Sequence, residues 1–189
     1  TGESATLSFE EHERVIEIVI QQAKKRIPVI AGTGSNSTEE AVKLTRDAAK
    51  AGADASLQVS PYYNRPTQKG LYEHFKKIAD SVEIPIILYN IAGRTGVNIE
   101  PETIAKLAQD CKNIVAVKEA SGSLDQMSRI RQLSPKEFIL ISGDDSLTLP
   151  VLSIGGAGII SVVANIVPGD VAGLVAAFEK GDLKKALKM

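Results

Sequence analysis

Apolar and polar residues follow two alternating periods along the chain. Short runs rich in β-branched residues begin near residues 28, 54, 85, 114, 138 and 158 and indicate buried strands. Between these runs, apolar residues recur at helical spacing. Ser8 and Ser37 each open a capping-box pattern at a helix start, and Pro101 and Pro168 stand where two later helices begin. The pattern therefore predicts six consecutive βα units.

Six βα units of this kind call for a parallel sheet covered by helices. A doubly wound open sheet and a barrel both fit, but chemically capable residues follow nearly every strand, which favours the barrel. A (β/α)8 TIM barrel needs eight strands and about 250 residues. We therefore expect an incomplete TIM barrel of the α/β class with strands 3–8 and their helices, lacking the first two strands and the C-terminal helical region. The partial barrel is expected over 1–179, and 180–189 as the start of that helical region.

Composition narrows the class of protein. The 189 residues are 43% hydrophobic and carry a net charge of −1, an ordinary globular balance without the basic excess of a nucleic-acid-binding protein. No apolar run approaches the roughly 18 residues of a membrane span. The single cysteine, Cys111, cannot form an internal disulfide, which fits a reducing compartment. We expect a cytoplasmic protein with a small-molecule substrate and neither nucleic acid nor membrane as a partner.

The strand predicted from Ile114 to Val117 ends in Lys118. At the mouth of a barrel, burial would disfavour the ammonium form of this lysine and leave a nucleophilic amine able to form an imine with a ketone. The alternative is a lysine that extends along apolar surface and places its charge in water. Taken by itself, the stretch leaves both interpretations open, and the commoner one is the second.

Residues after the neighbouring strands fit imine chemistry. A carbinolamine must lose water, and the hydroxyl of Tyr89 can both donate and accept a proton. Backbone N–H groups in the Gly32–Gly34 turn can bind a carboxylate. Each has an ordinary alternative, and for Tyr89 this is an anchoring role in the core. The turn does not match the dinucleotide-binding fingerprint, because Ser37 stands where the third glycine belongs.

Two other chemistries are disfavoured. Asp144 and Asp145 follow the fifth strand, where many barrels bind phosphate, and would repel an anion. His12 and His74 fall on separate predicted helices, and no spacing resembles a set of metal ligands. We therefore expect neither a metal nor a cofactor.

Together these motifs resemble the dihydrodipicolinate synthases, which are pyruvate-dependent class I aldolases of the N-acetylneuraminate lyase superfamily. The lysine and tyrosine motifs point to the superfamily, and the Gly93–Gly96 stretch points to the synthases. The matching stretches run in family order over practically the whole chain: Thr1–Leu7, Pro28–Gly34, Pro61–Pro66 with Gly70–Phe75, Tyr89–Asn90 with Gly93–Gly96, Val117–Gly122, Ser142–Asp145 and Gly158–Ser161.

The resemblance implies a reaction and a role for each matching residue. Pyruvate would condense with L-aspartate-4-semialdehyde to give 4-hydroxy-tetrahydrodipicolinate, on the route to diaminopimelate and lysine. Family members are commonly homotetramers built as dimers of dimers. The implied roles are Schiff-base formation for Lys118, proton transfer for Tyr89, completion of the neighbouring subunit's proton relay for Tyr63, binding of the pyruvate carboxylate for Thr1, binding of the second substrate's carboxylate for Arg94, and pocket lining by the main chain of Gly143 and Ile160.

A second set of residues resembles the site at which lysine inhibits some family members. Phe9 stands where some lysine-sensitive members carry a histidine, so weak or altered inhibition is expected. The residues of this lysine-inhibitor site are Ser4, Ala5, His12, Asn36, Glu40 and Tyr62.

Two alternatives to the synthase remain open. An N-acetylneuraminate lyase or a 2-keto-3-deoxy-sugar aldolase would share Lys118 and Tyr89 but take another aldehyde, and Arg94 argues against both. The other alternative is an inactive barrel fragment, because two open strand edges would weaken an incomplete barrel.

Overall fold

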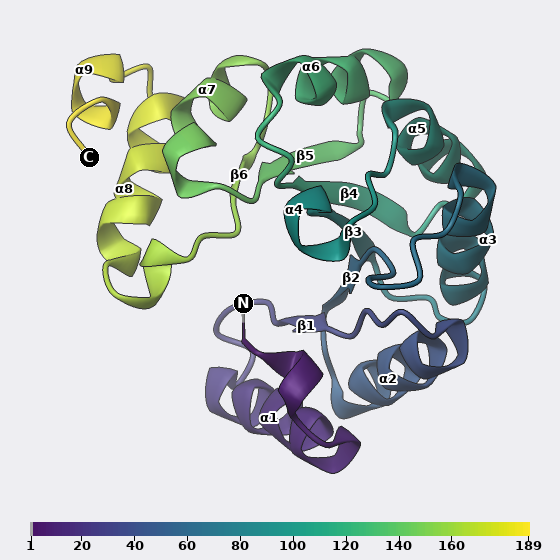
Figure 1. The fold of residues 1–189 in the computed structure, drawn as a ribbon. Coiled ribbons are helices and arrows are strands. Elements are labelled where there is room, and N and C mark those ends of the chain that lie inside the picture. The colour runs from purple at the N-terminus through teal and green to yellow at the C-terminus, as the bar shows by residue number, and fades with distance from the viewer. Residues whose placement is uncertain (1) are drawn as a thin grey trace.

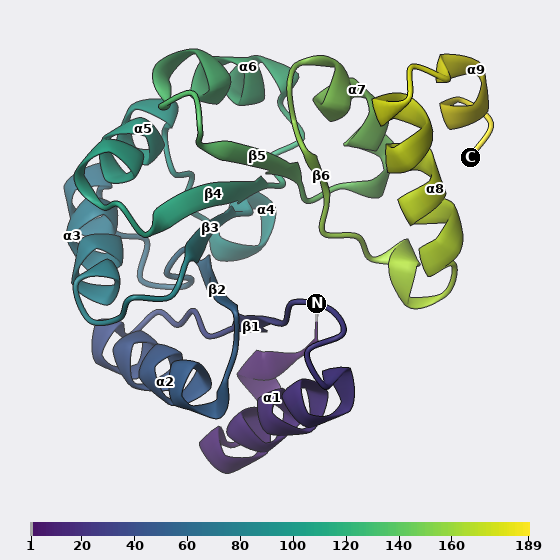
Figure 2. The same ribbon diagram turned by 180° about the vertical axis from the view of Figure 1, so that it is seen from behind.

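The computed structural model describes residues 2–189. Within them, six parallel strands form one sheet in the order of the chain. The sheet curls into a half-barrel, with the strands on the inner side and the helices on the outer side (Figures 1 and 2). The strands are β1 (Ile30–Gly32), β2 (Ala55–Val59), β3 (Ile86–Asn90), β4 (Ile114–Glu119), β5 (Ile139–Ser142) and β6 (Gly158–Ile159).

One or more helical segments follow each strand, so that the right-handed βα unit repeats along the sheet. The α-helices are α1 (Phe9–Ala23), α2 (Thr38–Ala51), α3 (Gln68–Ala79), α4 (Ala92–Thr95), α5 (Pro101–Asp110), α6 (Leu124–Leu133), α7 (Thr148–Ser153), α8 (Pro168–Glu179) and α9 (Leu183–Ala186). Short 3-10 helices span Ser4–Thr6, Asp145–Leu147 and Val163–Asn165. None of the helices in residues 2–189 has both the length and the apolar character that crossing a membrane requires.

The main core lies between the sheet and the helical layer. It contains Leu71, Phe75 and Ile78 of α3, packed with apolar residues of β3, β4 and β5 such as Leu88 and Val117. Each of these five side chains is at most 1% exposed. Because alternate strand residues point to opposite faces, burying this apolar set sends the intervening residues to the inner side of the half-barrel.

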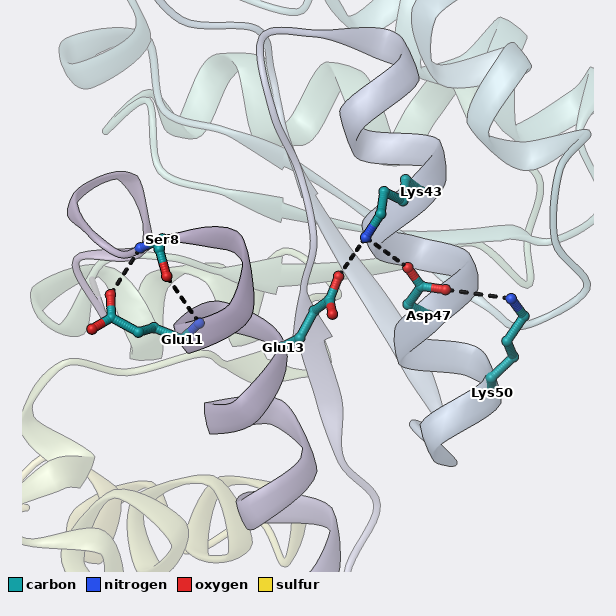
Figure 3. A network of polar contacts seen from close by, with 6 residues as sticks. All are labelled: Ser8, Glu11, Glu13, Lys43, Asp47 and Lys50. Carbon is teal, nitrogen blue, oxygen red and sulfur yellow. Dashed lines mark hydrogen bonds and ion pairs between the residues drawn. The ribbon is translucent and has the colours of Figure 1, made fainter.

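The predicted helix starts are confirmed by their caps. Ser8 Oγ accepts a hydrogen bond from Glu11 N at 3.2 Å, and the Glu11 carboxylate accepts one from Ser8 N at 2.9 Å (Figure 3). Lys43 on α2 bridges Glu13 on α1 at 2.6 Å and Asp47 at 3.0 Å. These ion pairs are largely exposed and contribute little to stability beyond orienting α1 against α2.

The last strand is shorter than predicted. The apolar run from Gly158 to Val163 suggested a strand throughout, but β6 ends at Ile159 and a 3-10 helix begins at Val163. The Asp145 carboxylate accepts hydrogen bonds from the N–H groups of Val162 and Val163, at 3.2 and 3.3 Å. These bonds turn the backbone out of the sheet, so the prediction beyond Ile159 was wrong.

One face of α1 also differs from the prediction. The helical spacing of apolar residues predicts that Val15, Ile16, Ile18, Val19 and Ala23 share the apolar side of this helix, yet Val15, Ile18 and Val19 are each between 43% and 49% exposed. A second, smaller core cluster contains Ile16 of this helix together with Ala31, Ala48 and Ala53, and Ile20 packs against it partly buried. Helix α1 lies next to β1, the strand at one end of the sheet (Figures 1 and 2), and no residue in 2–189 covers these three side chains. The division of the chain at residue 179 stays a prediction.

Candidate active site

Two of the predicted catalytic residues lie side by side on adjacent strands. Lys118 of β4 is the register partner of Tyr89 in β3 and of Ile141 in β5. The Lys118 Nζ lies 4.0 Å from the centre of the Tyr89 ring, a cation–π distance. Both residues stand at the carboxyl ends of their strands, where the connecting loops converge. The predicted pairing of amine and phenol is therefore present in the fold.

The surroundings of these two groups change their proton affinity. Burial lowers the pKa of the Lys118 amine, while the negative charge of Asp145 acts in the opposite direction. Burial also raises the pKa of the Tyr89 hydroxyl, and the positive charge of Arg94 partly opposes that rise. A lysine that is deprotonated more easily is a better nucleophile, and a phenol that keeps its proton can act as a donor.

Arg94 belongs to α4, a short helix that overlaps the Gly93–Gly96 stretch. The residue is exposed, and the salt bridges among residues 2–189 do not include it. Its charge acts on Tyr89, as the pKa of that residue records. The guanidinium is thus available to bind the carboxylate of a ligand at the carboxyl ends of the strands.

Gly143 lies close to the side chain of Lys118, with no room for a Cβ between them. Its N–H donates to the Glu119 carbonyl at 2.8 Å, which continues the ladder between β4 and β5. A Cβ at this position would lie 2.6 Å from Ala120 Cβ and 3.1 Å from Lys118 Cε. Ile160 follows β6, and its N–H donates to the Ser142 carbonyl at 3.0 Å. Both predicted main-chain positions therefore lie at the strand-end edge that also carries Lys118.

Two predicted residues are not brought to this site. Tyr63 lies in the loop after β2 with a backbone φ of 73°, and its side chain is 92% exposed. The structure brings it into no recorded contact with Lys118 or Tyr89. Thr1 falls outside the residues that the structure describes.

The predicted lysine-inhibitor site corresponds to a separate pocket between α1 and the start of α2. The pocket has a volume of about 290 Å³ and is lined by Ser4, Ala5, His12, Glu40 and Tyr62, with Phe9 also in its wall. The sixth predicted residue, Asn36, does not line it, but its side-chain amide donates to the Tyr62 carbonyl at 3.2 Å. His12 Nε2 lies 2.8 Å from the Gly32 carbonyl, and Ser35 donates to the Glu40 carboxylate.

Sequence reasoning missed a polar network directly behind the lysine. The side chains of Glu119 and Asn90 are fully buried and hydrogen-bonded to each other. Both residues lie in the motifs that drew attention to Lys118 and Tyr89, but neither was assigned a role from the sequence. The alternation of strand side chains was the available signal, because it turns the residue after an inward lysine toward the helical layer. The described residues contain no cluster of three or more potential metal-ligating side chains.

These observations define a class: an α/β half-barrel of parallel strands with a half-buried lysine of lowered pKa at the strand ends. The chain belongs to the dihydrodipicolinate synthetase family, whose model matches residues 1–189. Membership of the family confirms the resemblance on which the site residues were chosen.

Named relatives and solved structures agree. The 4-hydroxy-tetrahydrodipicolinate synthase of Endomicrobium trichonymphae is 65% identical over the full chain. The crystal structure of dihydrodipicolinate synthase from Aquifex aeolicus has a TM-score of 0.97 at 53% identity, and covers 99% of this chain and 64% of that one. The chloride-inhibited enzyme from Acinetobacter baumannii, complexed with pyruvate, has a TM-score of 0.95 at 46% identity, over 99% of this chain and 64% of that one. The chain spans 65% of the length of the Endomicrobium relative.

Proposed function

We propose that this chain forms the catalytic part of a lyase that condenses pyruvate with L-aspartate-4-semialdehyde, giving 4-hydroxy-tetrahydrodipicolinate. The observation that carries the proposal is the Lys118 amine, which is half-buried, lowered in pKa and 4.0 Å from the centre of the Tyr89 ring. Membership of the family favours this synthase over the N-acetylneuraminate lyase and sugar-aldolase alternatives.

In the first half-reaction, the neutral Lys118 nitrogen attacks the C2 carbonyl of pyruvate. The carbonyl oxygen takes up protons and leaves as water, so that an imine joins Lys118 to C2. Loss of a proton from C3 then converts the imine into an enamine. We assign these proton transfers to the Tyr89 hydroxyl, because its position beside the amine lets it donate and accept in turn.

In the second half-reaction, the enamine C3 attacks the aldehyde carbon, and the aldehyde oxygen becomes the 4-hydroxyl group. The Arg94 guanidinium would hold the carboxylate of this second substrate through paired hydrogen bonds. The substrate's own amine then attacks C2, which closes the ring and releases the Lys118 amine. No oxidant, metal or cofactor enters this sequence of steps.

The remaining site residues belong to the same proposal. Thr1 would bind the pyruvate carboxylate, and the main chain of Gly143 and Ile160 would line the pocket. We assign Tyr63 to the active site of a neighbouring subunit within a homotetramer. Its 92% exposure supports this assignment, because a proton-relay tyrosine unused in its own subunit must face a partner.

We also propose that the full-length protein closes this half-barrel into a (β/α)8 barrel. β1 pairs with β2 alone and β6 with β5 alone, so the sheet of residues 2–189 has two free edges. The exposed apolar face of α1 lies at one of these edges. The greater length of the relatives supports further strands, and the buried thiol of Cys111 suits a cytoplasmic protein.

The pocket beside α1 is proposed as a lysine-inhibitor site. The Glu40 carboxylate provides a partner for an ammonium group, and the pocket volume of about 290 Å³ suits an amino acid. Phe9 in the wall removes a polar contact, so inhibition is expected to be weak. A lysine titration of the full-length enzyme measures this, and tight inhibition would contradict the assignment of Phe9.

The main proposal is tested by borohydride reduction of the full-length protein in the presence of pyruvate, followed by peptide mapping. The reduced adduct is expected on Lys118 and is expected to vanish in Lys118→Ala. Lys112→Arg is the matched control, since Lys112 is an exposed residue just ahead of the same strand. An adduct on another lysine, or none in the native enzyme, would refute the proposal. A panel of aldehydes then separates the synthase from the aldolases.

A further inference from the structure

A buried carboxylate lies immediately behind the reactive lysine. Glu119 follows Lys118 on β4, so its side chain points to the opposite, helix-covered face, where it is 0% exposed. Its Oε1 accepts from Ser121 N at 2.8 Å and Asn90 Nδ2 at 3.2 Å, and its Oε2 accepts from Asn90 Nδ2 at 3.0 Å and Gln126 Nε2 at 3.1 Å. All of these partners are N–H donors. The site therefore suits a carboxylate, whose two oxygens both accept, and does not suit an amide, whose nitrogen is itself a donor.

The same network reaches the segment that carries Arg94. Asn98, just beyond α4, pairs with Gln126 through two hydrogen bonds of 2.8 and 3.1 Å. Its Oδ1 also accepts from Asn90 Nδ2 at 2.8 Å, and Asn90 Oδ1 accepts from Ile99 N at 3.0 Å. The segment 91–98 therefore leaves β3 at Asn90 and returns to the same cluster at Asn98. Asn90 donates directly to the Glu119 carboxylate, and Asn98 is connected to it through Asn90 and Gln126.

We propose that Glu119 is a positioning residue that fixes the Arg94 segment relative to Lys118. It touches neither substrate, and this role rests on the proposed synthase function. Lys118 and Tyr89 are held by the sheet ladder, whereas Arg94 is an exposed residue whose place depends on the ends of its segment. Loss of Glu119 therefore weakens recognition of the second substrate more than formation of the pyruvate imine.

The amide variant Glu119→Gln tests this role because it keeps the size of the side chain and changes its chemistry. An amide nitrogen would face the N–H donors of Gln126 or Asn90, and buried donors without an acceptor are costly. In the full-length enzyme we expect the KM for L-aspartate-4-semialdehyde to rise about tenfold or more, which corresponds to about 1.4 kcal/mol. The yield of the borohydride-trapped pyruvate adduct on Lys118 should stay within about threefold of the unmodified enzyme.

A rescue variant separates positioning from general damage. In Glu119→Gln combined with Gln126→Glu, the carboxylate at 126 can accept from the amide at 119, which restores the link between β4 and α6. The bond from residue 126 to Asn98 Oδ1 is lost, but that oxygen still accepts from Asn90 Nδ2 at 2.8 Å. We therefore expect the KM of this double variant to fall at least about threefold below that of Glu119→Gln, without a full return to the unmodified value. Gln132→Glu is the matched control, because it makes the same change on α6 beside Arg129, outside the network. It should leave both substrates unaffected.

Several outcomes would overturn the positioning role. These are an unchanged KM in Glu119→Gln, an equal loss for both substrates, or a double variant no better than the single one. If Glu119→Gln does not fold, Asn98→Ala replaces it. This change cuts the link at the half-buried end of the segment and must produce the same split between the two substrates. If the unmodified enzyme forms no pyruvate adduct, the synthase function itself falls. If the adduct forms, but the variants affect the KM for L-aspartate-4-semialdehyde no more than the yield of the adduct, only the positioning role is refuted.

Discussion

Replacing Gly143 with alanine tests the geometry around Lys118 most directly. The added Cβ would lie 2.6 Å from Ala120 Cβ and 3.1 Å from Lys118 Cε. Carbon atoms pack best at about 3.5–4.0 Å, so the first contact is too short by about 0.9 Å. Ala120 Cβ is attached directly to the backbone and cannot rotate away. The 2.8 Å hydrogen bond from Gly143 N–H to the Glu119 carbonyl holds the ends of β4 and β5 at this spacing.

The strain must therefore move the ends of β4 and β5 apart or push the lysine side chain aside. Overpacking of this kind typically costs about 1–3 kcal/mol. A displacement of about 1 Å at a reacting group can lower the rate about a hundredfold. We expect Gly143→Ala to lose about 1–3 kcal/mol in unfolding free energy, and to lose imine formation by a larger factor than that destabilisation accounts for.

Urea denaturation of the full-length protein measures the first effect, and the rate of borohydride trapping with pyruvate measures the second. Gly169→Ala on α8 is the matched control, because a Cβ there meets no heavy atom within 4 Å. Its stability and trapping rate should be unchanged or slightly improved, since alanine favours helix. If Gly143→Ala traps pyruvate at the normal rate with normal stability, the close approach to Lys118 inferred here is wrong.

Three further predictions concern charge and capping. Asp145→Asn removes a negative charge that raises the pKa of Lys118, so that pKa should fall and the acid limb of the pH profile of kcat/KM for pyruvate should move to lower pH; a shift upward would contradict the assignment. Burial lowers the pKa of His74 to about 4 from the ordinary 6.5, so the unfolded chain binds this proton first as the pH falls. The free energy of unfolding is therefore unaffected by this group above pH 6.5 and falls toward pH 4, by up to about 1.4 kcal/mol per pH unit. In His74→Gln, denaturation at several pH values should show that the free energy of unfolding falls less steeply over this range. Ser8→Ala removes the cap of α1 and should cost about 1 kcal/mol in urea denaturation, whereas an equal loss in Ser4→Ala, outside the cap, would argue against the capping box.

The order and type of the elements could be predicted from local chemistry. Apolar runs of four residues, Ile86–Tyr89 and Ile114–Val117, identify β3 and β4, because strands of a helix-covered parallel sheet are rich in apolar residues. The caps at Ser8 and Ser37 locate helix starts because the same side chains satisfy free N–H groups wherever the helix lies. The predicted length of β6 was too great because the end of this strand depends on hydrogen bonds to the Asp145 carboxylate. The apolar run itself does not indicate these bonds.

The candidate site divides in the same way. The end of a buried strand left the role of Lys118 open, and the imine-forming role was implied by the family resemblance. The structure adds that Lys118 is the register partner of Tyr89. That Gly143 lies against the lysine needed the coordinates, because it depends on the spacing of β4 and β5.

What the sequence by itself determined is the repeating βα pattern and the family, because each element and each motif consists of residues that are close together in the chain. It also singled out Lys118 as the candidate amine. Only the tertiary structure decided which groups surround that amine. Asn90, Asn98, Glu119 and Gln126 are up to 36 positions apart along the chain. They meet because a parallel sheet brings the carboxyl ends of its strands to one edge. A buried carboxylate there needs hydrogen-bond donors, and in this fold they come from segments that are distant in sequence.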